Sequence, residues 1–133
     1  GGTLVIARNA SPGAFQDFWG VNWGDDVVYI DGADWFPTIN GAETYSLRDP
    51  DGMTIEGPTP PLELATVAAR TDADASADDV GAWSVDIAPN SGSTPGVSAA
   101  SGGVSGTPYI SEYADPTGAG NYVYEYVEIG IVP

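Results

Sequence analysis

The chain has 133 residues, of which 19 are acidic and 3 basic, with no histidine and no cysteine, and its formal net charge is −16. This length suits one domain with a single core. The missing cysteine excludes disulfides and thiolate metal sites, and the missing histidine removes the commonest general base and metal ligand. Since so acidic a surface repels phosphates and anionic membranes, we expect neither nucleic acid nor a membrane as a partner.

The charge also bears on where the protein works. Self-repulsion of this size is best tolerated where salt or divalent cations screen it. No run of residues approaches the about 20 apolar residues that a membrane helix needs. We therefore expect an extracellular or cell-surface protein, with ordinary solubility charge as the alternative explanation.

The composition predicts an all-β fold, because 18 Gly and 11 Pro punctuate aromatic and β-branched runs at short intervals. Residues 3–7 and 25–32 are typical of short strands. Residues 44–56 alternate as a hairpin does, around an Asp49–Gly52 turn. The side chains expected to face the core from this hairpin are Tyr45, Leu47, Met53 and Ile55.

The second half of the chain is less regular. Residues 59–70 are compatible with a short helix capped by Thr59 or with extended chain. Residues 83–87 alternate and predict a strand. Residues 91–108 are almost all small or turn-forming and predict a linker. The tryptophans are most simply packing residues, although Trp19 and Trp23 are conceivable platforms for stacking on sugars.

Two further strands are expected after this linker, over 109–114 and 121–129. In the second, Tyr122, Tyr124 and Tyr126 share one face, while Val123, Val127 and Ile129 share the other. A strand that is apolar on both faces belongs inside a sheet or between layers, and an exposed edge of this kind is a template for pairing.

Three segments carry a resemblance to a known family. "GGTLVIARN", "YSLRDPDGMTIEG" and "AARTDADASADDVGAWSVDIAPNSGSTPG" resemble, in this order, the later part of the lamin-tail domain, an immunoglobulin-like β-sandwich of nuclear lamins and many secreted prokaryotic proteins. "PYISEYADPTGAGNYVYEYVEI" resembles the opening hairpin of that domain, but here it follows the terminal Thr94-Pro95-Gly96. The resemblance implies an immunoglobulin-like β-sandwich in rotated order, with no evident strand between the hairpin and residues 1–7.

The resulting organisation is a sandwich body (1–96), a Gly/Ser-rich linker (97–108) and a C-terminal donor hairpin (109–133). The hairpin can insert into the next identical copy, fold back on its own body as a circular permutant, or belong to a tandem array of which this sequence is a piece. We favour insertion, which gives a head-to-tail homopolymer. The side chains expected at that joint are Tyr109, Ile110, Tyr122, Val123, Tyr124, Tyr126, Val127 and Ile129.

The predicted function is accordingly a structural subunit of an extracellular filament or surface fibre, assembled by donor-strand complementation from identical subunits. The alternative is a non-catalytic adhesion or binding module for glycans or a calcium-bridged matrix. Catalysis is not expected. The paired carboxylates Asp25/Asp26 and Asp78/Asp79 would point to opposite faces of a strand, and no nucleophile with a base is available.

Two candidate sites remain. Asp72, Asp74, Ser76 and Asp78 have the alternate spacing of a calcium loop, with Asp79 as an extra oxygen, so calcium is the one cofactor considered. Ala77 and Trp83 stand where such a loop needs Gly and Glu, so a solvated acidic loop is the other interpretation. Asn9-Ala10-Ser11 matches the N-glycosylation pattern.

Overall fold

The computed structural model describes residues 1–88, 93–98 and 100–133. Within these residues it contains eight strands, one α-helix and two 3₁₀ helices. The elements are β1 (Thr3–Ala7), α1 (Pro12–Trp19), β2 (Val27–Asp31), β3 (Leu47–Arg48), β4 (Thr54–Glu56), β5 (Thr66–Arg70), η1 (Val80–Ala82), β6 (Trp83–Ile87), β7 (Pro108–Ala114), η2 (Asn121–Tyr124) and β8 (Tyr126–Ile131).

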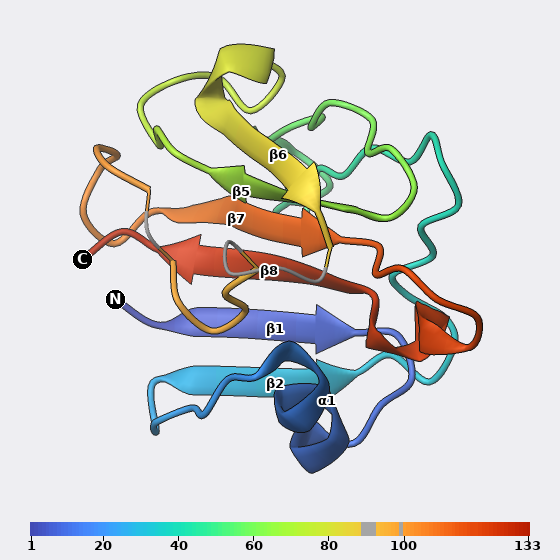
Figure 1. The fold of residues 1–133 in the computed structure, drawn as a ribbon. Coiled ribbons are helices and arrows are strands. Elements are labelled where there is room, and N and C mark those ends of the chain that lie inside the picture. The colour runs from blue at the N-terminus through green and yellow to red at the C-terminus, as the bar shows by residue number, and fades with distance from the viewer. Residues whose placement is uncertain (89–92, 99) are drawn as a thin grey trace.

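Most of the strands form one mixed sheet, in the order β2-β1-β8-β7-β5-β6 (Figure 1). β1 and β2 run parallel, and every other neighbouring pair in this sheet is antiparallel. β3 and β4 form a separate two-stranded sheet. The prediction of a mostly β fold is confirmed, and the arrangement is consistent with a β-sandwich.

The C-terminal hairpin lies in the centre of its own sheet. β8 pairs with β1 from Thr3↔Gly130 to Ala7↔Tyr126, and β7 pairs with β5. The two strands lie between β1 and β5, which do not pair with each other in the described chain. This is the fold-back arrangement. The expectation that residues 1–96 await a neighbour's hairpin is not met within this chain.

The sequence-based prediction missed helix α1, although its signals are present. Ser11 is the N-cap and its hydroxyl accepts a hydrogen bond from the Ala14 N–H at 3.3 Å. Pro12 occupies the first turn, and Gly20 ends the helix with φ of 69°. These are the residues that favour a helix start and a left-handed C-terminal cap.

The large sheet separates two cores, one on each of its faces. On one face, α1 packs its Phe15 and Trp19 against Val5 of β1 and Tyr126 of β8. On the other face, the chain between residues 39 and 62 packs on a second cluster. The buried members of that cluster are Ile39, Tyr45, Leu62, Ala68, Ala82, Trp83, Ile110, Tyr113 and Val127.

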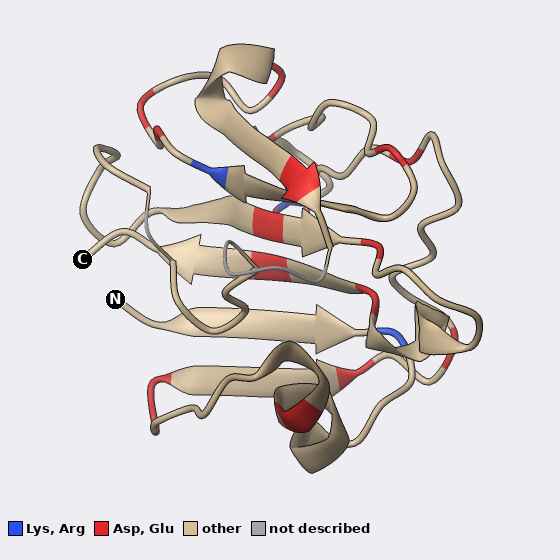
Figure 2. Cartoon of the chain, in the orientation of Figure 1, with Lys and Arg blue, Asp and Glu red and all other residues tan. Residues whose placement is uncertain are grey.

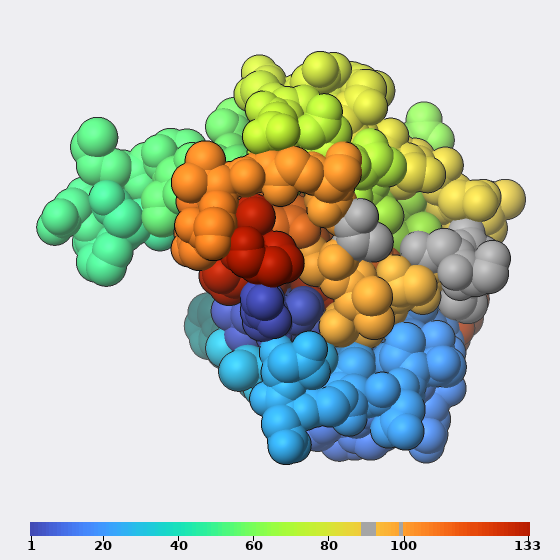
Figure 3. Space-filling view, turned by 90° about the vertical axis from the view of Figure 1, so that its left-hand side faces the viewer, coloured from blue at the N-terminus to red at the C-terminus, as the bar shows by residue number. Residues whose placement is uncertain are grey.

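The β3–β4 hairpin is shorter and more exposed than the sequence predicts. Its turn is as expected, with Asp49 N–H bonded to Met53 O at 2.9 Å and Gly52 at φ of 85°. However, Met53 is 69% and Ile55 is 46% exposed, so the prediction that both face the core is wrong. The segment containing this hairpin projects from the body in Figure 3, where it is drawn in teal green. Its tip therefore lacks the second layer that would bury those two side chains.

One ion pair attaches β4 to the large sheet. Arg70 of β5 is 2% exposed, and its guanidinium contacts the Glu56 carboxylate at 2.8 Å. The other oxygen of Glu56 accepts a hydrogen bond from the Ile110 N–H at 2.6 Å. The guanidinium also lies 5.0 Å from the ring centroid of Trp83. Glu56 thus binds two strands of the large sheet to the small one.

The chain around residue 123 also differs from the prediction. A strand was expected over 121–129, but residues 121–124 form η2 and β8 begins only at Tyr126. The left-handed Gly120, at φ of 81°, precedes η2. The predicted two-faced alternation of Tyr122, Val123 and Tyr124 is therefore wrong, because the period of two does not apply to a 3₁₀ helix.

The other irregular segments are held to the body. Residues 59–63 have no regular secondary structure and Leu64 and Ala65 form a turn, so the short helix considered for this region does not form. Of the predicted linker, residues 91, 92 and 99 lie outside the described part. Ser101 N–H bonds to Thr71 O at 3.1 Å, and Gly103 N–H bonds to the Asp74 carboxylate at 2.9 Å. The described part of this linker is docked rather than free.

Candidate assembly site

The hairpin supplies central side chains to both cores. Tyr126 is fully buried, and its ring centroid lies 5.5 Å from that of Phe15 and 5.1 Å from that of Trp19, both edge to face. On the opposite face, Tyr113 makes edge-to-face contacts with Trp83 at 5.1 Å and with Tyr45 at 5.7 Å. Aromatic pairs of this geometry add to the stability that comes from area burial.

Two buried carboxylates face each other in the middle of this hairpin. Glu112 of β7 pairs in register with Glu128 of β8, and their exposed fractions are 2% and 0%. Acidic segments interrupt the central strands at this level in Figure 2. Glu112 accepts hydrogen bonds from the Tyr126 hydroxyl and from the Thr94 N–H, the latter at 3.0 Å. Glu128 accepts from Ser111 Oγ at 2.6 Å. These carboxylates are therefore satisfied by donors inside the protein.

Burial shifts the acidity of both groups in the same direction. Desolvation raises the pKa of Glu112 to about 8, and the neighbouring Glu128 carboxylate adds to the rise, while the bonds from Tyr126 and Thr94 oppose it. Desolvation likewise raises the pKa of Glu128 to about 7, against its bonds from Ser111 and Gly96. Near neutral pH these two carboxyls therefore hold protons that an exposed Glu would have lost.

The same carboxylates bind the segment that carries Thr94-Pro95-Gly96. The Gly96 N–H donates to Glu128 at 2.5 Å, and the Trp23 indole N–H donates to Pro95 O at 2.8 Å. Gly96 has φ of 93°, and a Cβ at this position would collide with the Trp23 indole. Glycine is required here for both reasons. The motif thus connects α1 and its following loop to the hairpin.

A third buried acidic side chain, Glu125, anchors the start of β8. Glu125 forms an ion pair with Arg8 at 3.3 Å and accepts the Ile39 N–H at 3.1 Å. Burial raises the pKa of Glu125, and the bonds from Ile39 and Arg8 lower it. The Arg8 guanidinium also lies 5.1 Å from the ring centroid of Tyr122. Arg8 therefore connects the end of β1 to the turn before β8.

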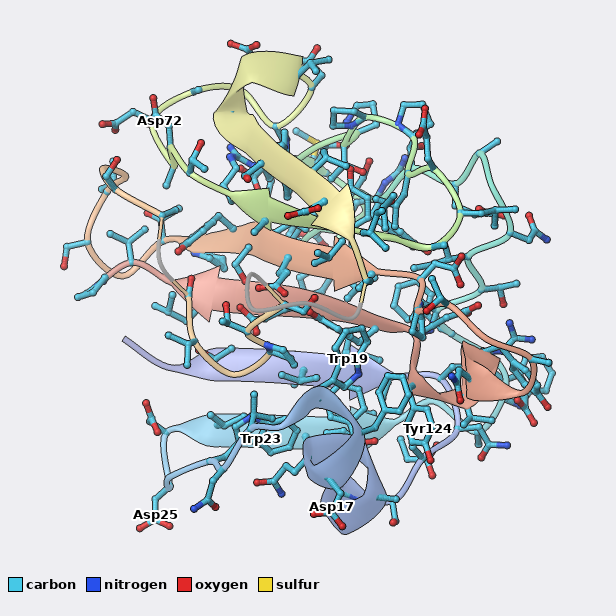
Figure 4. The ribbon with its side chains drawn as sticks, viewed as in Figure 1. Asp17, Trp19, Trp23, Asp25, Asp72 and Tyr124 are labelled. Atoms are coloured by element: carbon cyan, nitrogen blue, oxygen red, sulfur yellow. The ribbon has the colours of Figure 1, made fainter. Side chains whose placement is uncertain are left out.

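The predicted assembly residues have three different fates. Tyr109, Ile110, Tyr126 and Val127 are buried in the chain's own cores, and Ile129 is half-buried. Tyr124 stacks on Phe18 with centroids 4.2 Å apart, as its position beside α1 in Figure 4 allows. Tyr122 is 48% exposed, and Val123 O accepts the Asn9 N–H. All of them contact other parts of the same chain; Tyr122 is largely exposed, and Ile129 also lines the groove described next.

An apolar surface remains open on the face of the sheet opposite α1, at the β2–β1–β8 end. Val28 is 59%, Ile30 is 45% and Ile131 is 37% exposed. A groove of about 390 Å³ runs between this end of the sheet and the β3–β4 hairpin. Its side-chain lining includes Leu4, Val28, Leu47, Ile55, Ile129 and Ile131. We call Leu4, Ile6, Val28, Ile30, Ile129 and Ile131 the open face.

The candidate calcium ligands do not converge. The Asp72 carboxylate accepts the Asp74 N–H, the Asp74 carboxylate accepts the Gly103 N–H, and Ser76 donates to Asp78. Asp79 caps η1 through the Gly81 N–H. In the described part of the chain, no group of three or more acidic, His or Cys side chains is placed to hold a metal ion. These local bonds favour the interpretation of a solvated acidic loop. Figure 4 labels Asp72, which lies in this loop.

The other predicted sites are placed as follows. Asn9 is exposed, and its amide nitrogen bonds to the Asp34 carboxylate at 2.8 Å. Trp19 is 7% exposed and Trp23 is half-buried, so neither is a free platform for a sugar. Both indole N–H groups bond to backbone carbonyls. Trp35 is 88% exposed instead. Asp17 and Asp25 point away from the body in Figure 4 and are exposed.

The sequence interpretation missed the Glu112–Glu128 pair. Its signal was present, because each Glu lies within an otherwise apolar strand that was expected inside a sheet. A carboxylate at such a position needs buried donors.

Comparison with known proteins adds no relative. No family model matches the chain, and neither a curated protein nor a solved structure does so. No helix in the described residues is long and apolar enough to cross a membrane.

Proposed function

We propose that this chain is a structural subunit of an extracellular filament or surface fibre, joined head-to-tail to identical copies. The observation that carries the proposal is the open face. Contiguous apolar surface on a protein in water is typical of an interaction site. In a chain with 19 acidic residues, Asp26 is the one charged residue among those that line the groove at this face.

The fold that we propose is a lamin-tail-like sandwich in permuted order. Its support is the place of the C-terminal hairpin, whose strands lie between β1 and β5 and contribute to both cores. The small β3–β4 sheet is the partial second layer, and the open face is where that layer stops.

The first joint to consider is exchange of the hairpin, as the sequence predicts. A donated hairpin would make the same pairs with β1 and β5 of a neighbour that it makes in its own chain. Because the contacts are equal, closure within the chain is favoured in dilute solution, where a tethered hairpin has an effective concentration of about 1 mM or more. Exchange therefore needs a high protein concentration or assembly during folding.

Self-assembly itself tests the function. The purified chain is concentrated at low and high salt and inspected by electron microscopy and sedimentation. We expect thin fibres whose amount rises with protein and with salt, because salt screens the net charge of −16. A chain that stays monomeric over the whole range of both would contradict the proposal.

The binding-module alternative is favoured by one observation, the exposure of Trp35. An exposed indole face can stack on a sugar ring. Titration of soluble glycans, with and without calcium, is followed by tryptophan fluorescence in the wild-type chain and in Trp35→Ala. A saturable signal that Trp35→Ala removes, in a chain that forms no fibres, would favour the binding module over the filament.

A further inference from the structure

One tryptophan of this chain is placed unlike the other three. The indole N–H groups of Trp19, Trp23 and Trp83 all donate to backbone carbonyl oxygens. Trp35 is 88% exposed, and its indole has neither a ring contact nor a hydrogen bond with the described residues. Tryptophan is enriched among the side chains that anchor protein interfaces, where it fills a pocket of the partner. Trp35 is therefore a candidate anchor.

The turn that carries Trp35 is strained and firmly held. The Trp35 N–H bonds to Gly32 O at 2.9 Å, and the two residues between them, Ala33 and Asp34, have φ of 50° and 69°. Such values are unfavourable for residues with a Cβ, and they cluster at functional sites. The Asp34 N–H bonds to Arg8 O at 2.9 Å, and its carboxylate lies 3.7 Å from the Arg8 guanidinium. The backbone that presents the indole is thus pre-organised, which lowers the entropy lost on docking.

A cavity of about 400 Å³ lies at the other end of the large sheet, over side chains of β5 and β6. Its lining includes the rings of Pro60, Pro61 and Trp83. Val80, a further lining residue, is 70% exposed. We call this space the β5–β6 cavity. Trp35 follows β2, and β2 and β6 are at opposite ends of the strand order, at the bottom and the top of the sheet in Figure 1. Trp35 therefore leaves the cavity of its own chain unfilled.

The indole and the β5–β6 cavity are chemically complementary. An indole has one polar group, an N–H that donates and cannot accept. Among the residues that line the cavity, only Glu63 is charged, and it is exposed. Its carboxylate accepts hydrogen bonds and, when ionised, does not donate. The rest of the lining is apolar or aromatic, as the faces of an indole require, and a buried indole N–H needs an acceptor. The cavity thus offers both the apolar walls and an acceptor of negative charge.

We propose that the Trp35 indole of one copy inserts into the β5–β6 cavity of the next copy, with its N–H donating to the Glu63 carboxylate. The proposal rests on the proposed filament function and names its joint. Because the turn and the cavity are different surfaces, the contact is head-to-tail, and repeated addition gives an open filament. The turn follows β2, whose Val28 and Ile30 belong to the open face, so the open face lies beside the joint.

The charges beside both surfaces give the joint its salt dependence. Asp31 and Asp34 precede Trp35 in the chain, and the Arg8 guanidinium is the one positive group near them. At the cavity, Asp79 precedes Val80. Negative groups therefore approach one another when the joint forms. Because the Debye length falls from about 10 Å at 0.1 M salt to about 3 Å at 1 M, the joint forms at high ionic strength.

The test changes each side of the joint and one site elsewhere. Trp35→Ala removes the anchor, Val80→Asp puts a carboxylate in the cavity, and Val104→Asp adds one at a loop residue that is 72% exposed. We expect Trp35→Ala to need about thirtyfold more protein for half-assembly, the effect of losing an interface hot spot, and Val80→Asp about tenfold more. Val104→Asp assembles like the wild type. Equal assembly of all four chains would overturn the proposal.

Mixing the two variants tests the polarity of the joint. Trp35→Ala keeps an intact cavity and Val80→Asp keeps an intact anchor. At a concentration that just assembles the wild type, each alone stays monomeric and an equal mixture stops at pairs in sedimentation. If Val80→Asp alone forms stable dimers, the Trp35 side chains of two copies meet each other and the proposal fails. Val85→Thr, in the same lining, replaces Val80→Asp if its circular dichroism departs from that of the wild type.

A free indole tests the cavity without any assembly. N-acetyltryptophanamide is titrated into the monomer at low salt, and the backbone amide signals are followed by NMR. We expect saturable shifts at Leu62, Val80 and Val85, which line the cavity, in the wild type and in Trp35→Ala, and much weaker shifts in Val80→Asp. The same compound should dissolve fibres at high salt. If the cavity signals do not respond, the cavity takes no indole and the proposal is overturned.

The wild type separates failure of the joint from failure of the function. A wild-type chain that never assembles at any salt or protein concentration overturns the filament function itself. Wild-type fibres that Trp35→Ala forms equally well overturn only the joint. If, in addition, Trp35→Ala loses a saturable glycan signal, Trp35 serves a binding site for sugars and not the filament.

Discussion

The C-terminal hairpin and the edge strands β2 and β6 differ in how deeply their side chains are buried. Tyr113, Tyr126 and Glu128 of the hairpin have exposed fractions of 1%, 0% and 0%. In the edge strands, Val28 and Val85 are more than half exposed. The last strands in the sequence are thus the central strands in space. Loss of hairpin contacts should unfold the molecule, while changes at the exposed positions of the edge strands should leave it folded.

The largest effect is expected at Tyr126. Its replacement by Ala removes a ring that contacts Phe15 and Trp19 and leaves a cavity between the helix and the sheet. We expect Tyr126→Ala to lower the free energy of unfolding by about 3–5 kcal/mol, the range for large aromatic truncations in cores. Urea unfolding followed by tryptophan fluorescence measures the loss.

Tyr122→Ala is the matched control for that substitution. Tyr122 is 48% exposed, and its main contact is with the Arg8 guanidinium. Its removal should cost about 1 kcal/mol or less. Equal losses for the two tyrosines would show that the hairpin is not inserted as described.

An intermediate effect is expected at Gly96, which connects the Thr-Pro-Gly motif to the hairpin. Gly96→Ala forces a positive φ on a residue with a Cβ and pushes that Cβ into the Trp23 indole. We expect a loss of about 2–4 kcal/mol, from backbone strain together with overpacking. Gly106 also has a positive φ, of 77°, but a Cβ added there would have no other atom within 4 Å. Gly106→Ala therefore measures the backbone strain without the collision. If Gly106→Ala lowers the free energy of unfolding as much as Gly96→Ala does, the collision with Trp23 contributes nothing to the loss.

The smallest expected effect is a change in pH dependence. The raised pKa values of Glu112 and Glu128 mean that the folded chain binds more protons than the unfolded one between about pH 4.5 and pH 8. Their contribution to stability is complete below the ordinary Glu pKa and is lost as pH rises through about 7 to 8. Glu112→Gln should therefore lose less stability than the wild type between pH 5 and pH 8.5.

The midpoint of thermal unfolding at those two pH values measures this difference. Glu63→Gln is the control. Glu63 is exposed, and its substitution removes one negative charge from the same net charge of −16. It reports the share of the pH dependence that comes from self-repulsion of the whole acidic chain. If Glu112→Gln and Glu63→Gln have the same pH profile, the buried pair does not titrate as described.

Much of this fold is predictable from local patterns, and the misses have physical causes. Strands at 3–7 and 83–87 and the Asp49–Gly52 turn follow from alternation and turn residues. Helix α1 was missed because aromatic residues outweighed its cap signals. Met53 and Ile55 alternate correctly but face water, because the second layer is only two strands wide. Alternation alone does not reveal how far a covering layer extends.

The candidate site divides in the same way. The apolar character of β7 and β8 could be predicted, and so could their place inside a sheet. Which chain provides that sheet could not, because pairing within a chain and between chains uses the same side chains. Glu112 and Glu128 depend on donors from Thr94 and Gly96, which lie far away in the sequence. A contact of this kind follows from tertiary structure and not from local pattern.

Hydrogen exchange on the monomer at low salt tests the central claim most directly. If the hairpin closes the sheet of its own chain, amides of β7 and β8 should exchange most slowly, and those of β2 and β6 fastest among the strands of the large sheet. In salt-induced fibres, the protection of β7 and β8 should stay unchanged. Fast exchange of β7 and β8 in the monomer, with protection that appears only in fibres, would contradict the account.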